Sequence, residues 1–388
     1  MIANCLMLAA GQFALVTSVF MLTGILPEIA TDFGVGVGRM GYAIAAFSLT
    51  YAIASPILAV ATSRFGARVI LITCLLVFAV ANVAATLVTD FTYLLIARVV
   101  AAAADGLYAA TACALVAQSA PPDRKGFMLA LVNLGVTLAF LVGVPLTTYL
   151  AGIFRWPGPF IFVAILAAMT AAALAIRLPH SSNPNVASLQ ERLLIFSVPR
   201  MLPTLLVTVV SYVGLFTVYN FIAPLLLQTL PPHTYSLSRL LFTFGLATIL
   251  GNIAGGLAAD RWGANVIVIV SLAVLAAVLF AADLFTVAVP AAYALMFILG
   301  FAHYMALTPL QYRIAQLGRD NAAIALALNG SSTYVGVALA AVVGGAVIER
   351  HGVEHLGMVG SSFKLIGIVI FLWSLWPIAA FARRRTPV

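Results

Sequence analysis

Two charged residues stand inside one long apolar run, in the segment ARVVAAAADGLYAATAC at residues 97–113. Arg98 and Asp105 are seven residues apart, so on a helix they lie near the same face. A charge at the centre of a bilayer costs about 2.5–3.5 kcal/mol on insertion scales, and such residues therefore face a cavity or the bundle interior. Asp105 is the only acid deep within an apolar run. We expect Asp105, with Arg98, to exchange protons. The alternatives are a structural pairing of Asp105 with Arg98 or a nearby tyrosine, and direct contact with a solute.

A second titratable candidate is His303, in the segment GFAHYMALTPLQ at residues 300–311. An imidazole can exchange a proton near neutral pH, so His303 could contact protons or a solute. The alternative is an imidazole that only bonds a neighbouring helix. Lys364 lies about two turns into the last apolar run, and we expect its side chain to reach the membrane surface.

Polar and aromatic side chains in the apolar runs are candidates for a binding cavity, where a few such groups orient a ligand. Thr208, Tyr212 and Tyr219 are spaced to share roughly one helical face. Their alternative role is hydrogen bonding between helices. The expected cavity residues are Gln12, Tyr108, Tyr212, Tyr219, Asn220, His303 and Gln311. The two His and two Glu of ERHGVEH, residues 349–355, match no strong ligand spacing, so no metal site is expected.

Composition places these residues in a membrane protein. Hydrophobic residues make up 64% of the 388 residues, charged residues only 8%, and mean hydropathy is +1.14. Soluble chains have about 45–50% apolar and about 25% charged residues. We therefore attribute the net charge of +8 to basic residues that orient the chain in the membrane, and not to nucleic-acid binding. The three cysteines show no paired spacing, which indicates neither a disulfide framework nor a metal site.

A spanning helix needs about 20 apolar residues, and the chain divides into twelve such runs, which predicts an all-α integral membrane protein. The expected runs are 4–30, 38–62, 69–88, 91–118, 124–151, 157–178, 201–230, 236–259, 265–285, 289–316, 321–348 and 356–382. We therefore expect a six-helix bundle at 1–178, a cytoplasmic linker at 179–200 and a second six-helix bundle at 201–388, around a central cavity.

The distribution of basic residues predicts that both termini are cytoplasmic. With the N-terminus inside, 13 Lys and Arg residues lie on the inner side, 4 lie on the outer side, and Arg98 and Lys364 lie within helices, which accounts for all 19. The outer four are Arg39, Arg155, Arg239 and Arg350.

Two stretches of the chain repeat each other. Residues 59–72, AVATSRFGARVILI, align with residues 256–269, GLAADRWGANVIVI, and each joins the second apolar run of its half to the third. A parallel six-plus-six repeat is a transporter architecture, in which two halves move around a site near the midplane. The pattern G-x-x-x-D-R-x-G resembles the loop signature of the major facilitator superfamily. The residues that carry it are Gly256, Asp260, Arg261 and Gly263 in the second half, and Arg64, Gly66 and Arg68 in the first, where Ala59 and Ser63 replace Gly and Asp.

Further segments resemble the drug–proton antiporter group of that superfamily, and most of all its arabinose/sugar-efflux-like branch. They include GILPEIATDFGV at 24–35, LVGVPLTTYLAGIFRW at 141–156, PLQYRIAQL at 309–317 and ALNGSSTYVGVALAAVVGG at 327–345. Gly143 and Pro145 resemble the antiporter motif of the fifth helix, with Thr147 where a Gly is usual. Val19 stands where many relatives carry a Glu. The resemblance implies that helices 1, 4, 7 and 10 line the cavity.

These features predict a secondary active transporter that exports a drug, sugar or metabolite by proton antiport with alternating access. The chain has no G-x-x-x-x-G-K-S/T motif, so we expect the proton gradient, without a cofactor, to supply the energy. The alternatives are a proton-independent facilitator or proton symporter, and, from other classes, a membrane-embedded enzyme or a receptor. No catalytic set is found, so an enzyme is not expected. The expected partners are a small-molecule solute, protons and the lipid of a bacterial inner membrane, without nucleic acid, and the protein is expected to be a monomer.

Overall fold

The computed structural model describes residues 1–121, 124–179, 189–231, 234–282 and 288–375, and this part of the chain forms helices without strands. The first group of helices is α1 (Ile2–Phe20), α2 (Leu22–Asp32), α3 (Gly41–Ala61), α4 (Ala67–Leu87), α5 (Phe91–Ser119), α6 (Lys125–Leu138), the π-helix η2 (Ala139–Gly143), α7 (Val144–Phe154) and α8 (Pro157–Arg177). The short α9 (Leu189–Leu194) and η3 (Ile195–Ser197) follow. The second group is α10 (Met201–Tyr219), α11 (Ile222–Thr229), α12 (Leu237–Trp262), α13 (Ala264–Phe280), α15 (Val289–Gly318), η4 (Arg319–Asn321), α16 (Ala322–His351), η5 (Val353–His355) and α17 (Leu356–Leu375).

Eleven helical segments of the described chain are long enough and apolar enough to cross a membrane. The apolar α13, at 17 residues, is shorter. The prediction of an all-helical membrane protein is therefore confirmed. Most of the expected linker at 179–200 and the end of the last expected run, beyond residue 375, lie outside the described residues.

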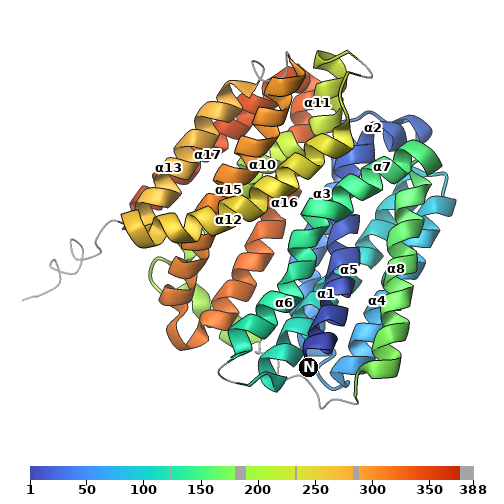
Figure 1. Ribbon diagram of the computed structural model, residues 1–388, viewed down its shortest axis with the longest axis vertical. Helices are drawn as coiled ribbons and strands as arrows, with labels where there is room; N and C mark the ends of the chain where they lie inside the picture. The colour runs from blue at the N-terminus through green and yellow to red at the C-terminus, as the bar shows by residue number, and fades with distance from the viewer. Residues whose placement is uncertain (122–123, 180–188, 232–233, 283–287, 376–388) are drawn as a thin grey trace, which may run out of the picture.

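The helices from α1 to α8 pack side by side, and those from α10 to α17 form a second group beside them (Figure 1). The N-terminus lies at one end of the molecule, which we call the base, and α2 and α11 lie at the opposite end, which we call the apex (Figure 1). Because successive long helices alternate in direction, each loop between them lies at either the base or the apex.

The first and seventh expected spans are each broken near the apex, which the sequence analysis did not anticipate. Met21 separates α1 from α2, and Asn220 and Phe221 separate α10 from α11. Each short apical piece contains a proline, Pro27 in α2 and Pro224 in α11. A proline lacks the backbone N–H and clashes with the carbonyl four residues earlier, which for Pro224 is that of Asn220. Helix α10 therefore ends at Tyr219, directly before Asn220.

The two groups of helices approach to backbone contact at the apex. A Cβ atom at Gly41 of α3 would overlap the carbonyl oxygen of Ala341 on α16, and one at Gly245 of α12 would overlap that of Phe140 in η2. The Ser238 hydroxyl on α12 also donates a hydrogen bond of 2.7 Å to the Pro145 carbonyl. Small residues at such places let helices come close. The apex is therefore closed.

Glycine substitutions in the fifth span test the close packing of helices within the first group. A Cβ at Gly135 would overlap the Ala9 carbonyl on α1, whereas one at Gly152 meets nothing within 4 Å. We expect Gly135→Ala to lower the free energy of unfolding by about 1–3 kcal/mol, because the packed helices must move apart. Gly152→Ala should leave it unchanged or raise it by about 1 kcal/mol, because Ala favours the helix. Detergent-titrated unfolding measures both, and equal effects of the two variants would contradict the packing.

Candidate functional site

Arg98 is buried at 1% exposure in the first group of helices and is bound to α1. Its Nη1 donates hydrogen bonds of 3.0 Å to both the carbonyl and the hydroxyl oxygen of Ser18. The Ser18 hydroxyl in turn donates to Asn82 Oδ1 on α4 at 3.0 Å. The guanidinium carbon lies 4.3 Å from the centre of the Phe47 ring, a cation–π contact. Arg98 therefore joins α1, α3, α4 and α5.

Asp105 is fully buried on the same helix, and neither carboxyl oxygen has a hydrogen-bond partner. Seven residues of helix span about 10 Å, too far for a direct bond between Asp105 and Arg98 unless their side chains turn toward each other. Instead Arg98 bonds Ser18. The neighbouring Gly106 carbonyl accepts a hydrogen bond of 2.9 Å from Ser55 on α3, which fixes this part of α5. The structure thus presents a buried carboxyl group with vacant acceptor positions.

Two tyrosines connect the surroundings of Asp105 with the second group of helices. Tyr51 on α3 and Tyr334 on α16 stack with ring centres 3.7 Å apart, and both are half-buried. Both lie within electrostatic range of Asp105. This stack joins the two halves at mid-height, and sequence reasoning missed it because the two residues are far apart in the chain.

His303 lies at 2% exposure on α15, where it lines a small cavity with residues of α10. The cavity residues are Thr208, Ser211, Tyr212, His303, Ala306, Leu307 and Leu310. Tyr212 meets the imidazole edge-on, with ring centres 4.6 Å apart. The structure thus brings together Tyr212 and His303, two of the expected cavity residues. Thr208 instead donates a hydrogen bond of 2.7 Å to Asn329 on α16.

An aromatic cluster fills the space between the halves on the apical side of this cavity. Phe20 and Phe140 of the first half lie 4.5 Å apart, and Phe20 lies 5.4 Å from Phe216 of the second. Phe140 also faces Tyr219 at 6.5 Å, and Tyr219 is fully buried. Phe140 belongs to the π-helix η2, a form that is frequent at functional sites. The cluster separates the cavity from the apex.

The other expected cavity residues lie in different surroundings. The Tyr108 hydroxyl is fully buried and bonds the Leu8 carbonyl on α1 at 3.1 Å, so it joins two helices. Gln12 is buried on α1 at 3% exposure. Asn220 is also buried, at the break between α10 and α11, and both of its amide atoms lack partners. Gln311 is exposed, toward the base of α15, and does not line the small cavity.

The two copies of the loop motif lie at the base, where α3 meets α4 and α12 meets α13. Gly263 has φ +88°, which residues other than glycine rarely adopt, whereas Gly66 has φ −63°. Arg68 donates a hydrogen bond to the Ala175 carbonyl at the end of α8. Within the described residues Asp260 forms no ion pair. The remaining motif residues, Arg64, Gly256 and Arg261, lie at the same two helix ends.

The antiporter motif lies between the halves. A Cβ at Gly143 would overlap the Thr17 hydroxyl on α1, and the Pro145 carbonyl accepts the bond from Ser238 on α12. The motif thus lies where α1, η2, α7 and α12 meet.

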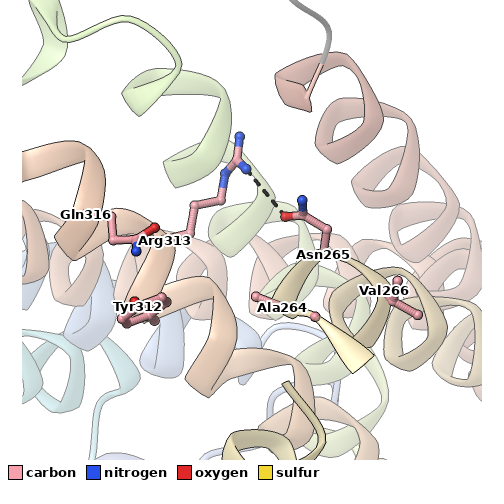
Figure 2. A pocket seen from close by; sticks show the side chains of 7 residues that line it. Ala264, Asn265, Val266, Tyr312, Arg313 and Gln316 are labelled. Atoms are coloured by element: carbon pink, nitrogen blue, oxygen red, sulfur yellow. Dashed lines mark hydrogen bonds between the residues drawn. The ribbon is translucent and has the colours of Figure 1, made fainter. Parts of the chain in front are cut away.

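A second, more open pocket lies at the base of the second half, beside Gly263 (Figure 2). Figure 2 shows Arg313 pointing toward Asn265, with 3.5 Å between the bonded atoms. Arg313 also donates to the Ser374 carbonyl at 3.0 Å, so it joins α15 to α17. This pocket is at the helix ends, far from the buried ionisable groups of the mid-spans, and we place the candidate site at those groups.

Comparison with known proteins gives the family. The model of the Major Facilitator Superfamily matches residues 8–231 and 204–388. The "Probable sugar efflux transporter" of Pasteurella multocida is 25% identical over 377 residues, with 96% of this chain and 92% of that protein covered. The "Inner membrane transport protein YdhP" of Escherichia coli K12 is 26% identical over 348 residues, with 89% and 88% covered.

Solved structures share the fold. The nucleoside transporter NupG, as its D323A mutant, matches with a TM-score of 0.78 at 15% identity, and covers 97% of this chain and 100% of its own. A bacterial homologue of the lysosomal transporter Spinster, in an inward-facing and occupied conformation, matches with a TM-score of 0.75 at 16% identity, with 99% and 98% covered. The chain belongs to the Major Facilitator Superfamily and is a multi-pass membrane transporter of small solutes, not an enzyme.

Proposed function

We propose that this transporter exports a small organic solute in exchange for protons, with Asp105 as the proton-exchanging group. The observation that carries the proposal is the full burial of the Asp105 carboxyl group without any hydrogen bond to either oxygen. Ionisable groups buried in membrane spans are costly and mark proton and ion pathways. Because no donor holds this carboxylate, its charge is best compensated by a proton or by a cationic group of a solute.

Arg98 has a different role in this proposal. Its bonds to Ser18 hold it between α1 and α5, on the face that Asp105 shares. A fixed positive charge two turns away favours the deprotonated carboxyl group when a path to water opens. Arg98 thereby assists proton release, and Asp105 carries the proton.

The orientation follows from the basic residues. The described base contains arginines at both loop motifs and at the ends of α8 and α15, while the apex contains Arg39, Arg155, Arg239 and Arg350. Because cytoplasmic loops are rich in Lys and Arg, we place the base and both termini in the cytoplasm of a bacterial inner membrane. The closed apex then faces outward, which leaves the cytoplasmic side for the entry of an internal solute.

The solute class is proposed from the site and from the relatives. Four tyrosines, Tyr51, Tyr212, Tyr304 and Tyr334, form ring contacts near the candidate site. Such groups suit a neutral or weakly charged solute rich in oxygen. Relatives named as probable sugar efflux transporters support a sugar-like solute. The proton gradient would supply the energy without a cofactor, and a single chain completes the fold.

Replacing Asp105 tests proton coupling. In inverted membrane vesicles with an imposed acidic interior, we expect sugars or nucleosides from a panel to collapse the pH gradient with wild-type protein. Asp105→Asn removes the exchangeable proton and should slow this collapse by about tenfold or more. A pH-sensitive fluorescent dye follows the gradient.

Asp90→Asn is the matched control, because Asp90 is an exposed N-cap on the same helix and Asn caps equally well. Collapse at the wild-type rate in Asp105→Asn would reject the role of Asp105. Solute movement without any collapse in wild type would favour a facilitator.

Alternating access requires the Tyr51–Tyr334 stack to separate, and cross-linking tests this. In a chain whose three native cysteines are replaced by serine, we expect Tyr51→Cys and Tyr334→Cys together to be joined by a short bis-methanethiosulfonate, which forms a reducible disulfide with each thiol. Transport should then stop, because α3 and α16 cannot part, and should return after reduction. The single-cysteine variants control for modification alone. Transport that continues at full rate in the cross-linked protein would contradict the mechanism.

A further inference from the structure

Lys364 on α17 is buried at 0% exposure, so the expectation that its side chain reaches the membrane surface is wrong. Its Nζ donates hydrogen bonds to the Ser211 carbonyl at 2.6 Å and the Ser211 hydroxyl at 3.0 Å, and lies 3.3 Å from His303 Nδ1. An ammonium group has three protons, and each of them has an acceptor here. No carboxylate of the described residues forms an ion pair with it.

These bonds determine how His303 faces the cavity. With Lys364 protonated, its ammonium group has no acceptor orbital, so Nδ1 of His303 accepts and the ring proton of the neutral imidazole is on Nε2. Nε2 is buried and has no hydrogen-bond partner. It lies on the opposite edge of the ring from Lys364, in a residue that lines the small cavity with Ser211 and Tyr212. His303, a residue of the cavity wall, thus has one unused N–H donor and lies next to the buried Lys364.

The first half contains a similar arrangement with one difference. Arg98 binds the carbonyl and hydroxyl of Ser18 on the first span, just as Lys364 binds those of Ser211 on the seventh. In the first half, Asp105 supplies a negative charge within electrostatic range of Arg98. The described residues give Lys364 no such acid. A buried cation without an opposite charge is costly, and a bound anion would offset that cost.

We propose that His303 and Lys364 anchor a carboxylate of the transported solute at this cavity, whose volume of about 10 Å³ must increase when the solute enters. His303 Nε2 donates directly to a carboxylate oxygen, and Lys364 is a positioning residue that holds the imidazole and supplies the charge. A single positive charge and a single donor match a monoanion. The proposal rests on the proposed function as a solute exporter, and it narrows the solute class to small organic acids such as sugar acids.

Matched pairs of solutes test the anchor by equilibrium binding to the purified full-length protein in lipid nanodiscs. Galacturonate is compared with galactose, and glucuronate with glucose, since each pair differs in the carboxylate. We expect wild type to bind each acid about tenfold or more tightly than the matched sugar, because charge-assisted hydrogen bonds contribute about 1.5–3 kcal/mol. Equal affinities, a preference for the sugar, or no binding of either acid would overturn the proposal.

Lys364→Met should reduce this preference, the ratio of the two affinities, to about threefold or less. Lys125→Met is the matched control, because Lys125 is the other lysine of the chain and is exposed at the base. A preference that survives in Lys364→Met would reject its role. If Lys364→Met does not fold, the variants His303→Leu and His303→Gln replace it. Loss of the acid preference in His303→Leu, with partial retention in His303→Gln, supports the donor role of His303. An equal preference in both variants contradicts that role.

The binding ratio and the pH-gradient assay separate the two proposals. Loss of pH-gradient collapse with the acid preference intact would reject proton coupling and leave the anchor. Collapse that requires Asp105 but shows no preference for acids would reject the anchor and leave the coupling.

Discussion

The cost of burying charge in an apolar bundle governs the centre of this molecule. Arg98 and Lys364 are both essentially inaccessible, and each is held by the carbonyl and hydroxyl of one serine on the first helix of its half. Removing such a partner would leave a buried charge with fewer bonds, so these contacts fix the rotation of α1 and α10 about their axes. The residues that line the central space are set by that rotation.

The charge networks lie within the halves, whereas the contacts between the halves are of another kind. At the apex, glycines meet backbone carbonyls, and aromatic rings such as Phe20 and Phe216 meet at a tilt of 38°. Such contacts have no buried ion pair to break, and a hydrogen bond like that of Ser238 can pass to water when the halves part. The halves can therefore move as units that keep the hydrogen bonds of their buried cations, which is what rigid-body alternation requires.

Helix positions could be predicted from the sequence because apolar length and flanking charge are local signals. The burial of Asp105 was predictable for the same reason. Its separation from Arg98 was not, since Ser18, eighty positions away, competes for the guanidinium. Lys364 was misjudged because α17 is apolar on all faces, so no pattern shows which face is buried. Its partners Ser211 and His303 are 153 and 61 positions away in the chain, and only the packed structure brings them together.

The two halves share a scaffold but differ in the ionisable groups they bury, and this difference bears on how solute and proton are exchanged. The first half has a cation and an acid on one helix, so its internal charges nearly cancel and a proton can change the balance. The second half has a cation and an imidazole, so its balance is completed only from outside. A solute carboxylate offsets the Lys364 charge of the second half, whereas a proton on Asp105 removes the charge that offsets Arg98 in the first. Each ligand thus changes the buried charge of a different half, and in opposite directions, so whether the bundle can enclose the site depends on which of them is bound.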